Sequence, residues 1–294
     1  MRVFLLVAFL LNSVAIAQKS NSSILHHTHT RMIDVGGTKM YCEVSGKGPP
    51  ILFLHTGLTD CRMWDDQVRS LSRRYMVIRC DLRGYGKTPR GSVRFSHYRD
   101  IATLLDSLGI AKVHLVGASF GGKVAIDVAL AFPQRIRSLV LCAPDISGTA
   151  PTAELLSIDS TEESYLKKYD FVHAAEFNVR TWVVGPYRRA EEVSVELQQK
   201  IIAMQLHNYS IPSPEGAQNV PLEPRAMRRI GEIRIPTLIL IGDKDIRSFQ
   251  TLSEIIANGI PTAIRIVIPN VAHMIPMEKP ELFNHMLLDF ITNK

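Results

Sequence analysis

The sequence lacks the features that mark membrane-spanning and nucleic-acid-binding proteins. Its N-terminal apolar run, residues 3–11, is shorter than the ~20 residues that a membrane-spanning helix needs. The net charge of +6 is spread along the chain, without a block of five basic residues or a basic stripe interleaved with aromatic residues. This pattern argues against nucleic acid as a partner. What the chain does have is 294 residues with 46% hydrophobic content, enough for one large core or a core with a subdomain.

The first 17 residues have the pattern of a secretory signal peptide. Arg2 supplies a short basic region, residues 3–11 supply the apolar region, and an A-x-A sequence ends at Ala17. We therefore expect cleavage after Ala17 and a periplasmic or secreted protein without a stable membrane span, with an uncleaved anchor as the competing interpretation. Residues 18–30 are polar and rich in histidine. We interpret them as a flexible linker rather than a metal-binding tract.

The cysteine pattern gives no metal site. Cys42, Cys61, Cys80 and Cys142 include no C-x-x-C spacing, so we expect no bound zinc. An even number of cysteines in an exported chain permits disulfides, with three possible complete pairings. Cys80 and Cys142, however, end apolar runs, where a buried thiol is ordinary. If a bridge forms, Cys42 with Cys80 is the first candidate, provided that their strands are neighbours.

Apolar runs with β propensity alternate with helical patterns from residue 31 onward. Two runs, residues 31–35 and 39–44, flank Gly36-Gly37 and predict a hairpin. Six further runs are typical of buried strands: residues 51–54, 76–78, 113–116, 138–141, 237–241 and 264–268. Helical patterns cover residues 63–72, 96–108, 123–132, 252–258 and 280–291. The alternation predicts an α/β fold with a mostly parallel, doubly wound sheet of eight strands.

One interval, residues 147–231, breaks this alternation. It has helical patterns at 163–184 and 191–207, then a proline-rich loop, and no strong buried strand. We interpret it as a helical cap inserted after the sixth strand, between a first core segment, residues 31–146, and a second, residues 232–294. Such a cap is expected over the carboxyl edge of the sheet, where ligands bind in open α/β folds.

The sequence Gly117-Ala118-Ser119-Phe120-Gly121 follows an apolar strand directly, and a helical pattern follows it. This is the context that a G-x-S-x-G nucleophile elbow requires. Gly117 and Gly121 leave room for neighbouring backbone in the tight turn. The hydroxyl of Ser119 then meets the start of a helix, whose free N–H groups favour developing negative charge. We predict Ser119 as a catalytic nucleophile, with a structural glycine-rich turn as the alternative.

A serine nucleophile needs a base, and the base needs an orienting acid. Two later loops at strand ends supply these groups in the chain order Ser…Asp…His. We predict His273 as the base, with a histidine that only bonds backbone as the alternative. For the acid we prefer Asp245 to Asp243, because Asp243 directly follows its strand and is placed to cap the turn.

The tetrahedral intermediate of acyl transfer is an anion that needs two backbone donors. One is expected to be the N–H of Phe120, the residue after the nucleophile. The other should come from the loop after Leu54, where we choose Gly57, with Leu58 as the alternative. His55 in the same loop is expected to support it by hydrogen bonding rather than to take part in chemistry.

Several other residues are given structural roles. Residues 81–88 contain glycines but do not match G-x-x-x-x-G-K-[ST], so they predict a turn rather than a phosphate site. His114, in the strand before the elbow, is expected to be a core histidine. His173 and His207, in the inserted interval, are expected either at the surface or in the lining of the pocket. Aromatic and methionine residues at helical spacings in the cap are interpreted as core rather than substrate contacts: Trp182, Tyr187, Met204 and Tyr209.

Taken together, five segments resemble the α/β-hydrolase fold superfamily over about residues 31–291. The segments are residues 54–57, 81–88, 117–122, 242–245 and 273–280. The resemblance implies a triad of Ser119, Asp245 and His273, a cap between strands six and seven, and no cofactor. The usual His-Gly is here His55-Thr56-Gly57, and the proline common after the acid is absent. A serine rather than an aspartate at the elbow argues against haloalkane or epoxide chemistry.

We therefore expect an exported serine hydrolase that cleaves a small carboxylic ester or lactone through an acyl-enzyme, as the small single-cap members of the superfamily do. One alternative is a C–C bond hydrolase or lyase with the same triad. Another is a non-catalytic protein of this fold that binds a small molecule. A peptidase has less support, because nothing in the sequence indicates an extended peptide groove.

Overall fold

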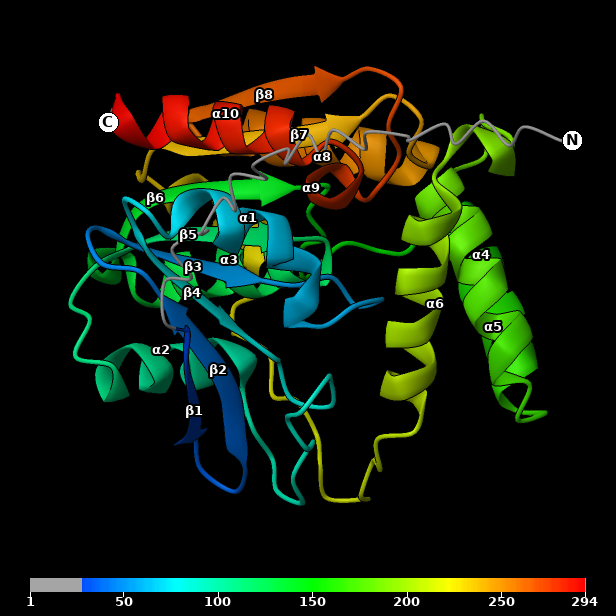
Figure 1. Cartoon of the computed structure of the whole chain (residues 1–294), viewed down its shortest axis with the longest axis horizontal. Coiled ribbons are helices and arrows are strands. Elements are labelled where there is room, and N and C mark those ends of the chain that lie inside the picture. The colour runs from blue at the N-terminus through cyan, green and yellow to red at the C-terminus, as the bar shows by residue number, and fades with distance from the viewer. Residues whose placement is uncertain (1–27, 294) are drawn as a thin grey trace, which may run out of the picture.

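Eight strands form a single sheet within residues 28–293, the part of the chain that the computed structural model describes (Figure 1). The strands are β1 (Thr28–Asp34), β2 (Lys39–Ser45), β3 (Pro50–Leu54), β4 (Met76–Cys80), β5 (Val113–Ala118), β6 (Ile136–Cys142), β7 (Thr237–Gly242) and β8 (Ala263–Ile268). Their order in the sheet is β1-β2-β4-β3-β5-β6-β7-β8. Only the pairs that involve β2 are antiparallel. The predicted fold class is therefore confirmed. The predicted signal peptide lies outside the described residues.

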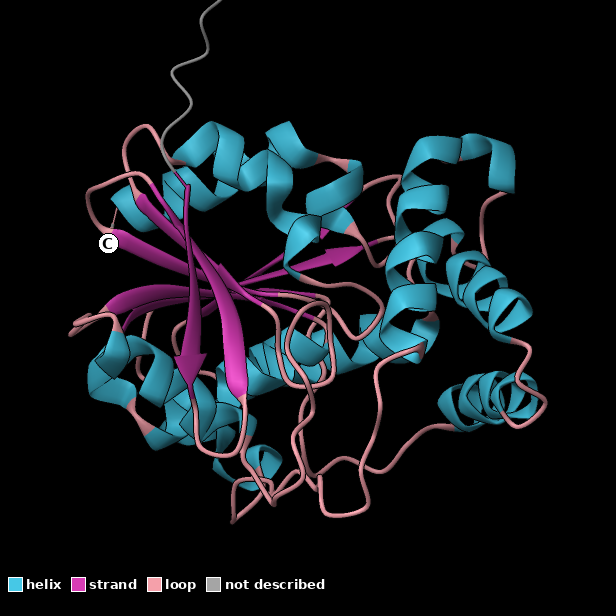
Figure 2. Cartoon of the chain, turned by 60° about the horizontal axis from the view of Figure 1, so that its bottom comes forward, coloured by secondary structure: helices cyan, strands magenta, loops and turns pink. Residues whose placement is uncertain are grey.

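Helices cover both faces of the sheet (Figure 2). One layer contains α2 (His97–Ser107), α3 (Phe120–Ala131) and α8 (Arg247–Gly259), and the other contains α1 (Asp65–Leu71) and α10 (Pro280–Thr292). Successive residues of β3 show why both layers are needed. Leu52 and Leu54 pack into the first layer, whereas Ile51 and Phe53 pack into the second. A strand buried on both faces has no polar alternation, which is why the central strands appear in the sequence as continuous apolar runs.

The first strand begins three residues earlier than the sequence suggested. β1 starts at Thr28 rather than Arg31, because it pairs with β2 along its whole length, from Thr28 opposite Ser45 to Asp34 opposite Lys39. The hydroxyls of Thr28 and Ser45 are 2.8 Å apart and hydrogen-bonded. Residues 28–30, assigned to the linker from composition, therefore belong to the hairpin.

The interval between β6 and β7 is helical, as expected, and Figure 1 shows its long helices standing together beside the sheet. Its elements are α4 (Ala153–Leu166), α5 (Phe171–Asn178), the π-helical turn η3 (Val179–Val184), η4 (Ala190–Glu192), α6 (Val195–Tyr209), α7 (Ala226–Arg229) and η5 (Ile230–Glu232). The remaining short elements of the described chain are η1 (Cys61–Trp64), η2 (Pro133–Arg135) and α9 (Ile275–Glu278).

The prediction of one helix over residues 163–184 is wrong. The chain forms α4, turns at Tyr169 with φ of 58°, and begins α5. Local caps explain the division. Thr152 accepts a hydrogen bond from the N–H of Leu155 at the start of α4, and Asp170 accepts one from the N–H of His173 at the start of α5. The apolar periodicity of the sequence continues across the turn and so hides it.

The four cysteines are buried free thiols in this structure. Cys42 and Cys80 lie directly opposite each other on β2 and β4, so the condition set for a bridge between them is met, yet no bridge is formed. Burial raises the pKa of the Cys42 thiol to about 12. It also raises the pKa of the Cys80 thiol well above its usual value. Among residues 28–293, no helix has both the length and the apolar content needed to cross a bilayer.

Candidate active site

Ser119 lies in a strained turn between β5 and α3. Its backbone has φ of 51° and ψ of −113°, outside the regions that a serine ordinarily adopts. Glycines on both sides make the turn possible. A Cβ on Gly117 would lie 2.4 Å from the carbonyl oxygen of Gly121, and a Cβ on Gly121 would lie 2.3 Å from that of Leu54. The turn therefore presses α3 against the end of β3, and Ser119 occupies its apex.

His273 and Asp245 form a buried hydrogen-bonded pair. Nδ1 of His273 lies 2.8 Å from Oδ2 of Asp245, and both side chains are almost fully buried. The other oxygen of Asp245 accepts the N–H of Ile246 at 2.8 Å, which fixes the carboxylate. With Nδ1 bound to an acceptor, Nε2 is the nitrogen left for a proton from a nucleophile. Gly242 allows this pairing, because a Cβ on it would collide with the carbonyls of Val271 and Ala272.

Asp243, the other candidate acid, has a different place. Its Oδ1 accepts the N–H of Asn270 at 2.7 Å, and its Oδ2 lies 3.1 Å from Nζ of the half-buried Lys244. It therefore ties the loop after β8 to the loop after β7. The structure brings Asp245, not Asp243, to the imidazole.

Two aromatic side chains and one backbone carbonyl hold His273 in position. Its ring packs 4.9 Å from the indole of Trp182 and 4.7 Å, edge to face, from the ring of Phe249. The backbone N–H of His273 donates a hydrogen bond to the backbone carbonyl of Trp182 at 3.1 Å. Trp182 belongs to η3 in the inserted helical segment, so that segment contacts the candidate base directly.

A cavity of about 720 Å³ lies over these groups, and both Ser119 and His273 line it. Within residues 28–293, neither the Ser119 hydroxyl nor Nε2 of His273 has a hydrogen-bond partner, so both face the cavity without a direct bond between them. Catalytic hydrogen bonds are often long in ligand-free sites and shorten when substrate binds. The arrangement leaves the candidate nucleophile, Ser119, and the candidate base, His273, open to a ligand.

The loop after β3 brings a second backbone donor beside Ser119. A Cβ on Gly57 would lie 3.7 Å from Cβ of Phe120, so the two backbones are neighbours, and both residues line the cavity. Leu58, the alternative, donates its N–H to Oγ1 of Thr56 at 3.2 Å. That bond leaves Gly57 as the donor of this pair that can face a ligand.

His55 supports this loop through both ring nitrogens. Nδ1 lies 2.7 Å from the carbonyl of Thr56, and Nε2 accepts the N–H of Leu82 at 2.9 Å. Burial is the largest effect on its pKa and lowers it, so the ring is neutral, as this donor and acceptor arrangement requires. The supporting role expected for His55 is therefore confirmed.

Residues 81–88 form a turn rather than a phosphate cradle, as predicted. Both oxygens of Asp81 accept backbone N–H groups, from Cys61 at 2.7 Å and from Lys87 at 2.8 Å. A Cβ on Gly86 would lie 2.2 Å from the same carboxylate. The space where an anion would enter is thus filled by the side chain of Asp81.

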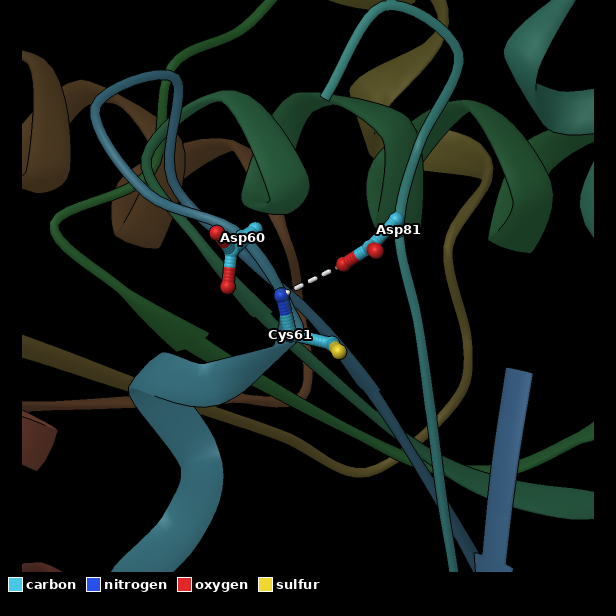
Figure 3. Close-up of side chains that lie close together, drawn as sticks. All are labelled: Asp60, Cys61 and Asp81. Atoms are coloured by element: carbon cyan, nitrogen blue, oxygen red, sulfur yellow. Dashed lines mark hydrogen bonds between the residues drawn. The ribbon is translucent and has the colours of Figure 1, made fainter. Parts of the chain in front are cut away.

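Asp60, Cys61 and Asp81 are the described residues with donor atoms close enough to hold a metal ion (Figure 3). Their donors are already engaged. Both oxygens of Asp60 bind the guanidinium of Arg62, at 2.8 and 2.6 Å, and those of Asp81 accept the two backbone N–H groups described above. Burial raises the pKa of the Cys61 thiol, so it is protonated and a poor ligand. The cluster therefore has a structural role: the Asp81 carboxylate holds η1 against the turn after β4.

The residues assigned to core or surface on sequence grounds divide into two groups. His114 is bonded to Ser138 at 2.7 Å and His173 to Asp170 at 2.8 Å, both away from the cavity. Trp182 and Tyr209, however, line the cavity, and Tyr187 is exposed, so the core interpretation was wrong for these three. For Met204, which is buried, it is confirmed. The periodicity of a helix shows that one face is covered but not whether a core or a ligand covers it.

Arg188 joins the inserted segment to the loop that carries His273. Its guanidinium is bonded to both oxygens of Glu278 on α9, and it donates to the carbonyl of Asn270 at 3.1 Å. It also donates to the carbonyls of Val183 and Val184, each at 2.8 Å. With 5% and 11% of the two side chains exposed, this is a buried ion pair in which nearly every donor has a partner. Nothing in the sequence distinguishes Arg188 from its neighbour Arg189, because the contact joins residues 90 positions apart.

Comparison with known proteins agrees with this architecture. Residues 49–172 match the family model described as the alpha/beta hydrolase fold. The chain is 28% identical to a putative carbamate hydrolase of Azorhizobium caulinodans, over 87% of this chain and 96% of that one. It is 26% identical to a 2-hydroxy-6-oxo-6-phenylhexa-2,4-dienoate hydrolase of Burkholderia cepacia, over 87% and 92% of the two chains. A thermophilic esterase from Thermogutta terrifontis, solved with malate bound, superposes with a TM-score of 0.74 at 26% identity and covers 91% of this chain and 98% of that one.

The fold and the relatives together define a hydrolytic enzyme. Residues 49–172 match the α/β-hydrolase family model, and the described sheet and helices have the corresponding fold. The resemblance stated from the sequence is confirmed at this level.

We predict that Arg188→Met lowers the free energy of unfolding by about 3–5 kcal/mol, because it leaves Glu278 charged, buried and unpaired. Arg189→Met is the matched control. Its ion pair with Glu192 is exposed, with 82% and 47% of the two side chains accessible, and should contribute less than about 1 kcal/mol. Denaturant unfolding of both variants measures the difference. Equal losses in the two variants would contradict the role given to Arg188.

Proposed function

We propose that this protein is an exported serine hydrolase that cleaves a small carboxylic ester or lactone through an acyl-enzyme on Ser119. His273 is the general base, Asp245 orients it, and the N–H groups of Phe120 and Gly57 receive the oxyanion. The observation that carries the proposal is the buried bond of 2.8 Å between His273 and Asp245 on the wall of the cavity that Ser119 also lines.

In the acylation step, the Ser119 hydroxyl attacks the carbonyl carbon and its proton passes to Nε2 of His273. The carbonyl oxygen becomes an anion between the N–H groups of Gly57 and Phe120, where preorganised donors typically lower the barrier by about 3 kcal/mol each. The imidazolium then gives the proton to the leaving oxygen, and the acyl group remains on Ser119. Asp245 stays ionised and stabilises the charged ring.

Deacylation repeats these steps with water. His273 takes a proton from a water molecule, which attacks the acyl carbon, and the returning proton frees Ser119. The elbow assists both steps, because α3 begins at Phe120, directly after Ser119, and the free N–H groups at a helix start favour developing negative charge. All residues required for this cycle belong to the chain, and none of its steps calls on a metal or cofactor.

A C–C bond hydrolase is the second candidate. It is supported by the similarity over 87% of the chain to the dienoate hydrolase of Burkholderia cepacia. The same serine, histidine and aspartate serve both reactions, so the triad does not distinguish them. The ester reaction is preferred because the thermophilic esterase of Thermogutta terrifontis superposes on 91% of this chain at 26% identity.

We predict that the purified protein hydrolyses short-chain esters or lactones and has at least tenfold lower kcat/KM toward vinylogous diketones. Ser119→Ala should remove both activities. A panel of acyl chain lengths and ring sizes, followed by spectrophotometry, makes the measurement. A preference for the diketones would favour the C–C hydrolase, and ester turnover that survives in Ser119→Ala would end the assignment of the nucleophile.

The two candidate acids give a sharper comparison. Asp245→Asn should lower kcat by roughly 10³–10⁴, because the imidazole loses its orienting carboxylate. Asp243→Asn is the matched control. An asparagine can still accept the N–H of Asn270, so kcat should remain within about threefold. Steady-state kinetics on one ester decides between them, and the reverse order of the two effects would exchange the roles of the two aspartates.

We also propose that the protein is exported and loses residues 1–17. The support is the pattern of the first 17 residues, in which a basic residue, an apolar run and an A-x-A sequence follow one another.

Expression of the full chain in a host with a periplasm tests this proposal. We predict a mature protein that begins at Gln18 and is recovered in the periplasmic or extracellular fraction. Intact mass measurement after fractionation gives both results. An unprocessed chain in the membrane fraction would instead indicate an N-terminal anchor.

A further inference from the structure

Arg90 lines the same cavity as Ser119 and His273, yet none of the described residues bonds to its guanidinium. Within residues 28–293 its guanidinium forms no hydrogen bond, ion pair or ring contact, and its Nε is buried. A guanidinium carries five donors and a permanent charge, so leaving it unpaired against a protein wall is costly unless another group completes it. The more deeply buried Arg83 and Arg188, by contrast, each bond both oxygens of a carboxylate, that of Asp100 and that of Glu278.

Gly84 provides the space that the guanidinium of Arg90 occupies. The guanidinium lies flat against Gly84, where a Cβ would come within 2.8 Å of Nε and 2.9 Å of a terminal nitrogen. Gly84 has φ of 82°, a conformation that disfavours other residues, and it lines the cavity itself. The guanidinium is therefore held at the cavity wall and not in open solvent.

The other basic side chains of the cavity are already neutralised. Nζ of Lys123 lies 3.0 Å from Oδ2 of Asp145. Nε of Arg225 lies 2.6 Å from Oε1 of Glu223. Both pairs connect groups within or beside the cavity lining. Arg90 is thus the cavity base for which the described chain supplies no counter-charge.

The acidic side chains of the cavity do not supply one either. Glu162 accepts hydrogen bonds from Tyr209 and Asn178, each at 2.7 Å. Asp159 is exposed on α4 and forms no ion pair with Arg90. The positive charge of Arg90 therefore remains available to a ligand.

Tyr85 lies on the cavity wall between Arg90 and the residues beside Ser119. It is the next residue after Gly84, and its hydroxyl lies 3.7 Å from the point where a Cβ on Gly57 would sit. Its ring packs 5.8 Å from that of Phe120. Burial raises the pKa of Tyr85, so the hydroxyl is a donor. One wall of the cavity thus runs from Gly57, beside Ser119, across Tyr85 to Arg90.

We propose that Arg90 binds a carboxylate group of the substrate, so that the preferred substrates are half-esters of small dicarboxylic acids or lactones that bear a free carboxylate. The proposal rests on the proposed function, because it assigns the substrate class of the same site. Planar guanidinium and carboxylate groups form two parallel hydrogen bonds, which gives orientation as well as attraction.

The charge balance of the cavity favours a carboxylate over a phosphate. Its lining contains three basic side chains, Arg90, Lys123 and Arg225, and three acidic ones, Asp145, Asp159 and Glu162. Lys123 is paired with Asp145 and Arg225 with Glu223, so Asp159 and Glu162 have no cationic partner in the described chain and only Arg90 is left to attract an anion. This balance favours a ligand with a single negative charge. A phosphate dianion would leave the second charge facing carboxylates.

The test compares monoethyl glutarate with ethyl glutaramate, which replaces the free carboxylate by a neutral amide of the same shape. Release of ethanol reports both reactions, and monoethyl succinate and adipate vary the spacer. The wild-type protein should prefer at least one half-ester over its amide by tenfold or more in kcat/KM. Arg90→Gln should lower kcat/KM for that half-ester by about 10- to 100-fold and change the amide by less than threefold. Arg90→Lys should restore part of the loss.

Arg225→Gln is the matched control, because Arg225 lines the same cavity but is paired with Glu223. It should leave both substrates within threefold. Equal effects of Arg90→Gln on the two substrates, or no preference for any half-ester, would overturn the carboxylate-binding role of Arg90. Turnover of the ethyl esters in that case would still support the proposed hydrolase activity.

A binding measurement separates this proposal from the catalytic one. Calorimetry of glutarate with Ser119→Ala and with Ser119→Ala/Arg90→Gln does not depend on turnover. At least tenfold weaker binding in the double variant supports the carboxylate site even if no ester is cleaved. Equal affinities in the two variants, or no binding of glutarate, succinate or adipate to either, overturn it.

Discussion

The site depends on one close approach between two backbones, that of Gly121 and the end of β3. A methyl group on Gly121 would lie 2.3 Å from the carbonyl oxygen of Leu54, so no other residue fits there without moving the helix or the strand. This contact sets the start of α3 against the loop that follows β3, and so brings the backbones of Phe120 and Gly57 together. It also stabilises Ser119 at φ of 51°, a conformation that costs of order 1–3 kcal/mol and persists only where the surroundings enforce it.

The other half of the site is held by the inserted helical segment. His273 donates its backbone N–H to Trp182 and packs its ring against the indole, while Arg188 bonds the carbonyl of Asn270 in the same loop. The segment that lines the cavity therefore also positions the candidate base. In the proposed function, these contacts couple substrate selection to the position of the imidazole. A substitution in the segment that shifts η3 will also shift the imidazole of His273, even if no substrate contact is lost.

The sequence predicted the sheet and the positions of the candidate triad, because both follow from local patterns. Continuous apolar runs marked the buried strands, and small residues around Ser119 marked the turn. Asp245 was preferred to Asp243 from the expected cap at a strand end, and the structure places Asp245 against His273. What the sequence did not predict depends on contacts between distant segments. The break between α4 and α5 is hidden by continuous apolar periodicity. The roles of Trp182, Arg188 and Arg90 depend on which partners reach them, or fail to, after the chain has folded.

The central claim is that Ser119 is a nucleophile activated by His273, and covalent labelling tests it most directly. The protein would be treated with a fluorophosphonate, digested and mapped by mass spectrometry, with Ser119→Ala and His273→Gln treated in parallel. The account predicts one adduct, on the peptide that contains Ser119, absent in Ser119→Ala and formed at least 100-fold more slowly in His273→Gln. Labelling of Ser119→Ala at the rate of the wild-type protein, or an adduct on another residue, would contradict it.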